Sequence, residues 1–305
     1  QALAYACLSS NIKSDFKNVT HILYVDIDEF WFTSDFTMSI QDYLKLLPAF
    51  DVLSFNWLWQ NGDDKDFELP FNNKKIRPDV RMKSLIPLAA LDRVVEYRCH
   101  APKMDNKQPS IVHLGPKGEA ITYGDHDQMF SIAPTLGAGA FVLHRVCRSA
   151  TEYVALLSRQ RPGVEFPFKN NRFGFTKTSS AVIALDKQKS QAYWTALEQF
   201  ISECEIVPLV SQSRQMVLEK AERSLELRSD VVAVHLLAYL KILKGTPHRK
   251  KVLANLEKFG ATAMKDQFAK NYFDAGMMFE GEGDIRHALG YLRLAHLSRP
   301  KGPII

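Results

Sequence analysis

The chain has 305 residues, of which 46% are hydrophobic and 24% are charged. This composition is that of a globular protein with room for one large or two ordinary domains, which excludes a disordered or fibrous chain. The formal net charge of +5 is mild for this length and demands neither nucleic acid nor a membrane as a partner. No apolar run approaches the roughly 18 residues that a membrane-spanning helix needs.

The cysteines point to a reducing compartment. Cys7, Cys99, Cys147 and Cys204 lie far apart and form no Cys-x-x-Cys pair. This spacing argues against a disulfide framework and against a zinc site. We therefore expect a cytoplasmic protein, either free or at the inner face of the membrane.

In chain order, the first half alternates between helical and strand patterns. Residues 1–13 predict a short helix. The unbroken apolar run after His21 predicts a central strand that is buried on both faces of a mostly parallel sheet. Further strands are predicted at residues 51–59, 80–88, 93–99, 109–114 and 138–144, and further helices at 38–47 and near 148–159. The expected fold class is therefore α/β.

The pattern changes after about residue 179, where only helical periods follow. Tyr272, Gly276 and Phe279, with small residues further on, fall at spacings that resemble a tetratricopeptide repeat. In such repeats small residues let two helices approach closely. We expect residues 1–178 to carry the sheet and residues 179–305 to form an all-α, helical-hairpin region that offers a surface to a protein partner.

Carboxylates gather directly after the first predicted strand, in the sequence HILYVDIDEFWF. In an extended backbone Asp26 and Asp28 project the same way from the carboxyl end of the strand, where open α/β sheets bind ligands. Two close carboxylates repel each other unless a cation joins them, and Mg²⁺ or Mn²⁺ prefers oxygen ligands. Such a metal can bind a diphosphate and act as a Lewis acid when the diphosphate is the leaving group.

The spacing alone has little specificity, because Asp-x-Asp also occurs at residues 64–66 and 125–127. Only the triplet that begins at Asp26 directly follows a strand of the buried type. The alternative interpretation is that Asp26 to Glu29 only form and cap the next turn.

At this point the sequence resembles a known family. The string LYVDIDEF is similar to the metal-binding Asp-x-Asp strand end of GT-A glycosyltransferases, in the DxDEF variant of family 2-like bacterial enzymes that act on surface polysaccharides. The segments QALAYA, FNWLWQNGD, MKSLI with YRCHAPK, and FVLHRVCRSATEYV agree with that family in order. The resemblance covers roughly residues 1–165 and implies a partial GT-A-like mixed sheet.

The resemblance implies an inverting transfer of a sugar from a nucleotide-diphosphate donor to a hydroxyl of a saccharide or lipid-linked acceptor. It assigns Asp26 and Asp28 to the metal and the diphosphate. Glu29 either orients an aspartate or lines the acceptor side, and we count Glu29 and Asp127 as the candidate catalytic residues. Asp127 lies in YGDHDQ, which is either an active-site loop or only a turn.

Three further residues are implied as contacts to phosphate. Lys83 supplies a point cation, and Arg148 pairs with phosphate in a bidentate manner. His144, at a predicted strand end, is either a further metal ligand or a phosphate contact. His100 and His113 are either structural histidines or the base that an inverting mechanism needs, and the structural interpretation is favoured.

The sequence departs from the family in several places. Arg145 follows His144 where the family carries an aromatic residue, and Leu156 occupies the register of a family lysine. Only 25 residues precede Asp26, whereas a single βαβ unit takes about 30. The nucleoside-binding half that precedes this strand in GT-A enzymes does not fit into that length, so we expect the 305-residue chain to bind nucleotide sugars poorly.

Two other classes of protein fit the same residues. The first is a non-catalytic interaction protein, in which the helical region recruits a partner and the α/β region is degenerate. The second is a metal-dependent hydrolase that uses the same carboxylates and releases free sugar without an acceptor. The segment FPFKNNRFGF mixes phenylalanine with basic residues, as RNA-binding patches do, but a loop anchored by phenylalanines is favoured and no nucleic acid partner is expected.

Overall fold

The computed structural model forms two compact units, each of them discontinuous in sequence. The described residues are 2–60, 62–71, 76–105, 107, 111–121, 139–159, 168–169, 172, 174–175, 187–224, 235–254 and 268–299. The first unit contains Gln1–Asn61, Leu69–Val146 and Thr178–Cys204. The second contains Gly62–Glu68, Cys147–Lys177 and Glu205–Ile305. The predicted boundary between residues 178 and 179 lies outside the described residues.

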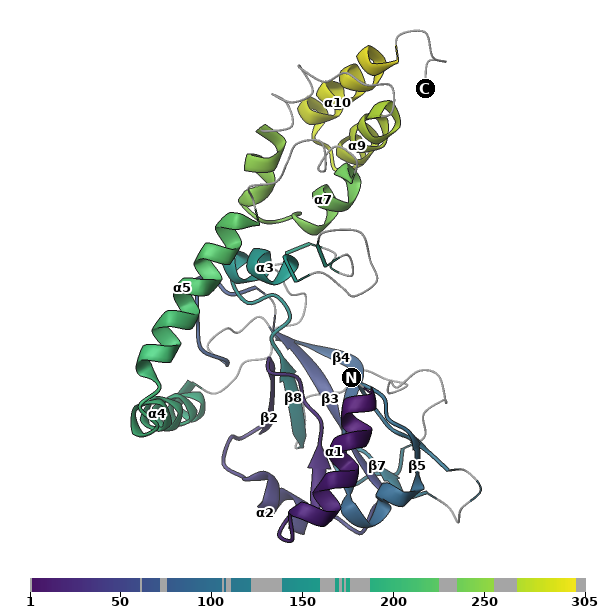
Figure 1. Cartoon of the computed structure of the whole chain (residues 1–305), viewed down its shortest axis with the longest axis vertical. Helices are drawn as coiled ribbons and strands as arrows, with labels where there is room; N and C mark the ends of the chain where they lie inside the picture. Colours follow the sequence, from purple (N-terminus) through teal and green to yellow (C-terminus); the bar gives the residue numbers. More distant parts are fainter. Residues whose placement is uncertain are drawn as a thin grey trace. The chain divides into compact units, whose positions relative to one another are not determined.

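A mixed β-sheet forms the centre of the first unit (Figure 1). Its strands are β1 (His21–Leu23), β2 (Glu29–Thr33), β3 (Val52–Gln60), β4 (Ile76–Pro87), β7 (His113–Leu114) and β8 (Ala140–His144). They follow the order β1-β4-β3-β8-β2, with β7 beside β3. β3 runs parallel to β7 and β8, whereas the other neighbouring pairs are antiparallel. A mixed sheet followed by helices confirms the α/β class, but the expectation of a mostly parallel sheet is wrong.

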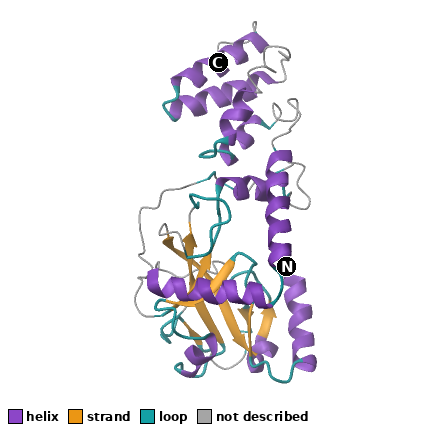
Figure 2. Ribbon diagram, turned by 90° about the vertical axis from the view of Figure 1, so that its left-hand side faces the viewer, coloured by secondary structure: helices purple, strands orange, loops and turns teal. Residues whose placement is uncertain are grey.

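The prediction that the apolar run after His21 forms a central strand is also wrong. β1 has three residues and lies at an edge of the sheet, where it pairs with β4. Ile22 is buried, but the run leaves the strand after Leu23. The ring of Tyr24 then stacks on Tyr5, with ring centroids 4.1 Å apart. Tyr24 therefore joins the end of this run to α1 (Ala2–Asp15), the helix that lies across the strands in Figure 2.

The two faces of the sheet carry different apolar clusters, because successive residues of a strand point to opposite faces. On one face Phe55 of β3 packs with Tyr43 of α2 (Ile40–Lys45). On the other face Leu58 of β3 packs with Phe71. Tyr193 of α4 (Lys187–Glu203) contacts Phe71, so α4 belongs to the second face. The remaining elements are the 3₁₀ helix Leu88–Arg93 and the hairpin of β5 (Val94–Glu96) and β6 (Lys103–Met104).

A chain of buried polar side chains links three strands. The Ser54 hydroxyl on β3 lies 2.7 Å from the Ser84 hydroxyl on β4 and 2.7 Å from His113 Nε2 on β7. Burial lowers the pKa of His113 to about 3, which keeps the imidazole neutral. These contacts confirm the favoured interpretation of His113 as a structural residue.

The second unit consists of helices. They are α3 (Ala150–Leu157), α5 (Val207–Arg223), α7 (Leu236–Ile242), α9 (Ala269–Gly281) and α10 (Ile285–Ser298). α3 begins with a capping box, in which the side chains of Ser149 and Glu152 satisfy each other's backbone N–H groups. The Tyr153 hydroxyl of α3 donates to the carbonyl oxygen of Ile242 in α7. Among the described residues no helix is both long enough and apolar enough to cross a membrane.

α9 and α10 form a tight hairpin, and they lie side by side in Figure 1. Gly283 allows the turn between them, because its φ of 75° lies in the left-handed region that glycine adopts readily. At Gly276 a Cβ atom would lie 2.7 Å from Leu292 Cγ and 3.2 Å from the carbonyl oxygen of Ala288. The close contact of the two helices therefore depends on the absence of a side chain at residue 276.

We predict that Gly276→Ala lowers the free energy of unfolding by about 1–3 kcal/mol, because the new methyl group overpacks the hairpin. Gly290→Ala is the matched control, since a Cβ atom there meets nothing within 4 Å. The control gains helix propensity and is expected to be more stable by about 0.5–1 kcal/mol. Urea denaturation followed by circular dichroism measures both changes, and equal effects of the two substitutions would contradict the close packing.

Candidate functional site

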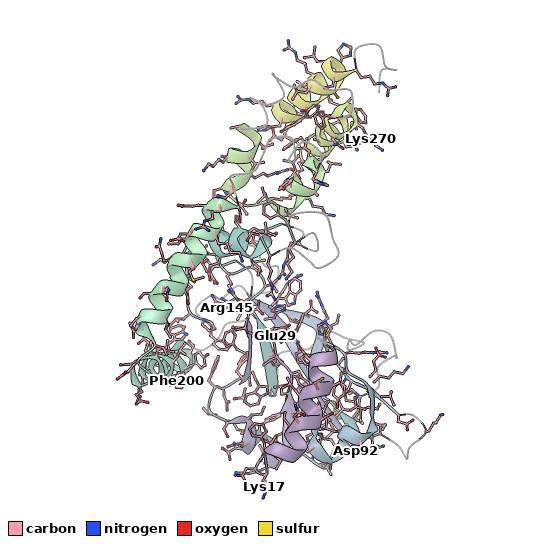
Figure 3. All side chains as sticks on the ribbon, in the orientation of Figure 1. Lys17, Glu29, Asp92, Arg145, Phe200 and Lys270 are labelled. Atoms are coloured by element: carbon pink, nitrogen blue, oxygen red, sulfur yellow. The ribbon has the colours of Figure 1, made fainter. Side chains whose placement is uncertain are left out.

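The acidic segment forms a turn at one end of the sheet. Residues 24–28 connect β1 to β2, the two outer strands of the sheet. The backbone N–H of Glu29 donates to the carbonyl oxygen of Asp26, and the N–H of Arg145 donates to that of Asp28. Figure 3 shows Glu29 and Arg145 at the same end of the sheet, whereas Lys17 and Asp92 lie at the other end. We call residues Asp26–Glu29 the acidic turn, and the expectation of an extended backbone there is wrong.

A buried lysine holds the acidic turn. Lys83 extends from β4, and its side chain is 1% exposed. Its Nζ lies 3.0 Å from Glu29 Oε2 and 3.4 Å from Asp26 Oδ2. The same Glu29 oxygen accepts a hydrogen bond of 2.8 Å from the backbone N–H of Asp26. Lys83 therefore balances the negative charge of the turn, and Glu29 holds its backbone. A buried charge needs partners of this kind.

The environment of Glu29 shifts its titration into the neutral range. Burial raises the pKa of Glu29 to about 7, although the Lys83 ammonium and the Asp26 N–H oppose the increase. Burial opposes the charge of Lys83, but the carboxylates of Glu29 and Asp26 raise the pKa of Lys83 overall. The Glu29 side chain is fully buried. This geometry favours the role of orienting Asp26 over the role of lining the acceptor side.

Asp28 faces a different strand from Asp26. Its Oδ2 lies 3.9 Å from Nε2 of His144, the last residue of β8. His144 pairs with Glu29 in the register of β2 and β8, and its ring centroid lies 4.3 Å from that of Trp57. The structure thus brings together five of the predicted residues, namely Asp26, Asp28, Glu29, Lys83 and His144. Within the described ranges, no group of three or more His, Cys, Asp and Glu side chains is arranged to hold a metal ion.

Two predicted residues are not part of this cluster as described. Arg148 belongs to the second unit, where it has a φ of 50° and precedes the capping box of α3. Its carbonyl oxygen accepts a hydrogen bond of 2.7 Å from the backbone N–H of Asp63. Asp127 lies outside the described residues.

Sequence reasoning missed four residues beside the acidic turn, Trp57, Trp59, Arg77 and Arg81, which we call the tryptophan–arginine face. The guanidinium carbon of Arg77 lies 4.4 Å from the Trp59 ring centroid. That of Arg81 lies 4.5 Å from Trp59 and 5.4 Å from Trp57. The sequence could have revealed this face through the alternation of side chains along a strand. Every second residue points to the same face, as in Trp-x-Trp on β3 and in the charged residues 77, 79, 81 and 83 on β4.

A small pocket lies next to the acidic turn. Its lining residues are Tyr24, Ser84, Ile86, Tyr97, Arg98, Cys99, His100 and Pro102. His100 Nδ1 lies 3.1 Å from the carbonyl oxygen of Met82, which can only accept a hydrogen bond. Nδ1 therefore carries the proton of the neutral ring, and Nε2 is the nitrogen that accepts one. Burial, with help from the charge of Lys83, lowers the pKa of His100 and keeps this form.

Neither a protein-family model, nor a curated protein, nor a solved structure matches the chain. The function is therefore inferred from the geometry of the site.

The pKa of Glu29 gives a prediction for stability against pH. Between the ordinary glutamate pKa and about 7, the folded protein holds a proton that the unfolded chain has lost. A rise in pH therefore favours the unfolded state, by at most about 1.4 kcal/mol per pH unit for one proton. We predict that the wild type loses stability relative to Glu29→Gln as the pH rises from about 5 to about 8.

The difference is measured by urea denaturation in the presence of a chelator. Titrating groups that do not interact with Glu29 are common to both proteins and cancel in the comparison. The control is Glu198→Gln, which makes the same substitution at an exposed glutamate of α4. A wild type that gains stability relative to Glu29→Gln with rising pH would contradict the buried environment of Glu29.

Proposed function

We propose that the protein is a glycosyltransferase that moves a sugar from a nucleotide-diphosphate donor to an acceptor hydroxyl, by inversion, in the synthesis of a surface polysaccharide. The observation that supports this most is the acidic turn, which Lys83 and Glu29 hold at the carboxyl ends of the parallel strands β3 and β8. Ligands commonly sit at such strand ends. The resemblance of LYVDIDEF to the Asp-x-Asp strand end of GT-A enzymes supports the same activity.

The acidic turn has a donor set that suits a divalent cation. The side chains of Asp26 and Asp28 are 47% and 15% exposed, so an ion can reach their oxygens. Mg²⁺ and Mn²⁺ prefer carboxylate oxygens, and His144 adds an imidazole beside Asp28. When bound, the cation would neutralise the diphosphate and act as a Lewis acid on the leaving group.

The residues of the chain supply the remaining functions. Lys83 and Glu29 position Asp26, and Lys83 adds a positive charge near the place of the diphosphate. An inverting transfer needs a group that takes the proton of the acceptor hydroxyl. His100 Nε2 and Asp127 are the candidates for that base.

We further propose that the sheet is a partial GT-A fold and that α9 and α10 are a tetratricopeptide-like unit that binds a protein partner. The close approach at Gly276 supports the second assignment. Ile285 and Leu289 of α10 are 57% and 64% exposed, which favours a partner there and keeps the non-catalytic interaction protein as the second candidate function.

The activity is tested with the protein expressed from its full-length gene. Mn²⁺-dependent release of nucleoside diphosphate is measured with a panel of nucleotide sugars and saccharide acceptors. We expect the Asp26→Asn, Asp28→Asn double variant to lose activity by at least about 100-fold, because the carboxylates that hold the cation are removed. The control is Asp64→Asn, Asp66→Asn, which changes the other described Asp-x-Asp triplet and should leave the activity within about twofold.

The proposal fails if the wild type releases nucleoside diphosphate from no donor of the panel, or if the double variant at Asp26 and Asp28 keeps the wild-type rate. We expect that variant to keep the binding of a protein partner through α9 and α10. Release of free sugar at the same rate without any acceptor would instead identify a hydrolase.

A further inference from the structure

One face of the sheet changes character along its strands. Leu53 and Phe55 make the first part of this face apolar on β3. Trp57 and Trp59 follow on the same strand, towards its carboxyl end. In the register of the sheet Trp59 lies between Arg77 on β4 and His144 on β8. The tryptophan–arginine face is therefore continuous with the acidic turn.

The cations on this face differ in their partners. Asp79 binds Arg81 through two oxygens, with Nε at 2.9 Å and a terminal nitrogen at 3.1 Å. Lys83 binds two carboxylates of the acidic turn. Arg77 has no carboxylate partner among the residues that the structure describes, and its guanidinium lies over Trp59. Because arginine stays charged in proteins, Arg77 leaves a positive charge uncompensated on this face.

Three hydrogen-bond donors without acceptors belong to residues of this face. Arg77 Nε, Trp57 Nε1 and Trp59 Nε1 are buried and have no hydrogen-bond partner within the described part of the chain. Trp57 is only 4% exposed, so water does not reach it freely. Each of the three groups can donate and none can accept, and buried donors of this kind are uncommon in folded proteins.

Trp31 provides a contrast on the same sheet. Its Nε1 also lacks a partner among the described residues, but its ring lies against Tyr43 and Phe55 in the apolar cluster. The tryptophan–arginine face differs from that cluster, because there, among the described residues, the unmet donors accompany an arginine without a carboxylate partner.

We propose that Arg77, Trp57 and Trp59 form a subsite for an oxyanion, the phosphate or carboxylate group of a substrate that reaches the acidic turn. A guanidinium that stacks on an indole ring still presents a pair of N–H groups at its edge, and this fork matches the two oxygens of a phosphate or carboxylate. The indole N–H groups supply further donors. The inference deepens the proposed function, on which it rests for the identity of the substrate.

Two sources of such an oxyanion fit this place: the diphosphate of the donor and the carboxylate of an acidic sugar in the acceptor. The probes are therefore inorganic diphosphate and glucuronate. Their binding to the 305-residue chain is measured by calorimetry in a chelator, so that neither turnover nor a divalent cation is needed. We expect at least one probe to bind.

Substitutions at Arg77 decide whether this binding uses the proposed subsite. Arg77→Met is expected to weaken it at least about 10-fold, and Arg77→Lys less, because lysine keeps the charge but loses the fork. Arg223→Met is the matched control, since the side chain of Arg223 is 78% exposed on α5 in the second unit. Circular dichroism checks that each variant is folded.

Indole N–H signals in NMR spectra give a second readout. The chain has four tryptophans, and Trp59→Phe assigns one signal while it keeps an aromatic ring. On addition of the probe, the signals of Trp57 and Trp59 are expected to shift. The signal of Trp194 serves as an internal reference, because its Nε1 already donates to the carbonyl oxygen of Pro70 at 2.7 Å.

Each outcome decides the proposal. Diphosphate binding that depends on Arg77 identifies the donor as the source, and glucuronate binding that depends on Arg77 identifies an acidic acceptor. The proposal is overturned if neither probe binds at millimolar concentration, or if Arg77→Met binds as the wild type does. Loss of transfer in the Asp26 and Asp28 variants is independent of these results, so the two proposals fail separately.

Discussion

The site depends on the ion pair between Lys83 and Glu29. Both side chains are buried, and removal of Lys83 would leave the fully buried Glu29 without its cation, which is strongly unfavourable. The pair also determines the backbone, because Glu29 Oε2 accepts the N–H of Asp26. Asp26 and Asp28 are thereby held at the sheet end with their oxygens partly exposed. The buried side chains of Lys83 and Glu29 thus position Asp26 and Asp28, whose oxygens a ligand can reach.

Strand order explains why these groups meet. β1 and β2 are consecutive in sequence but lie at opposite sides of the strand order, so the connection between them passes the strands that carry Lys83 and His144. The same end of the sheet carries the tryptophan–arginine face. A cation at the carboxylates and an oxyanion at Arg77 would then lie at the same end of the sheet.

Much of the fold could be predicted from the sequence, because hydrophobic periodicity identifies helices and strands over long segments. The role of the apolar run at Ile22–Val25 could not be predicted in this way. Periodicity does not say whether such a run packs against a strand or against a helix, and here Tyr24 packs against a helix. Local spacing predicts Asp26 and Asp28 as ligands, the resemblance to GT-A enzymes implies Glu29, Lys83 and His144, and the structure brings the five residues together. The stacking of Arg77 on Trp59 depends on the register of β3 with β4, which pairs residues far apart in sequence.

The central claim is that the acidic turn binds a divalent cation, and titration with Mn²⁺ under NMR observation tests it most directly. The paramagnetic ion broadens the signals of nearby amides in the 305-residue chain. We predict that the amide signals of Asp26–Glu29 and of Val146, just beyond His144, broaden at lower Mn²⁺ concentration than any others, and that Asp28→Asn removes the effect. Broadening that starts at Asp64–Asp66 instead, or that is unchanged in Asp28→Asn, would contradict the claim.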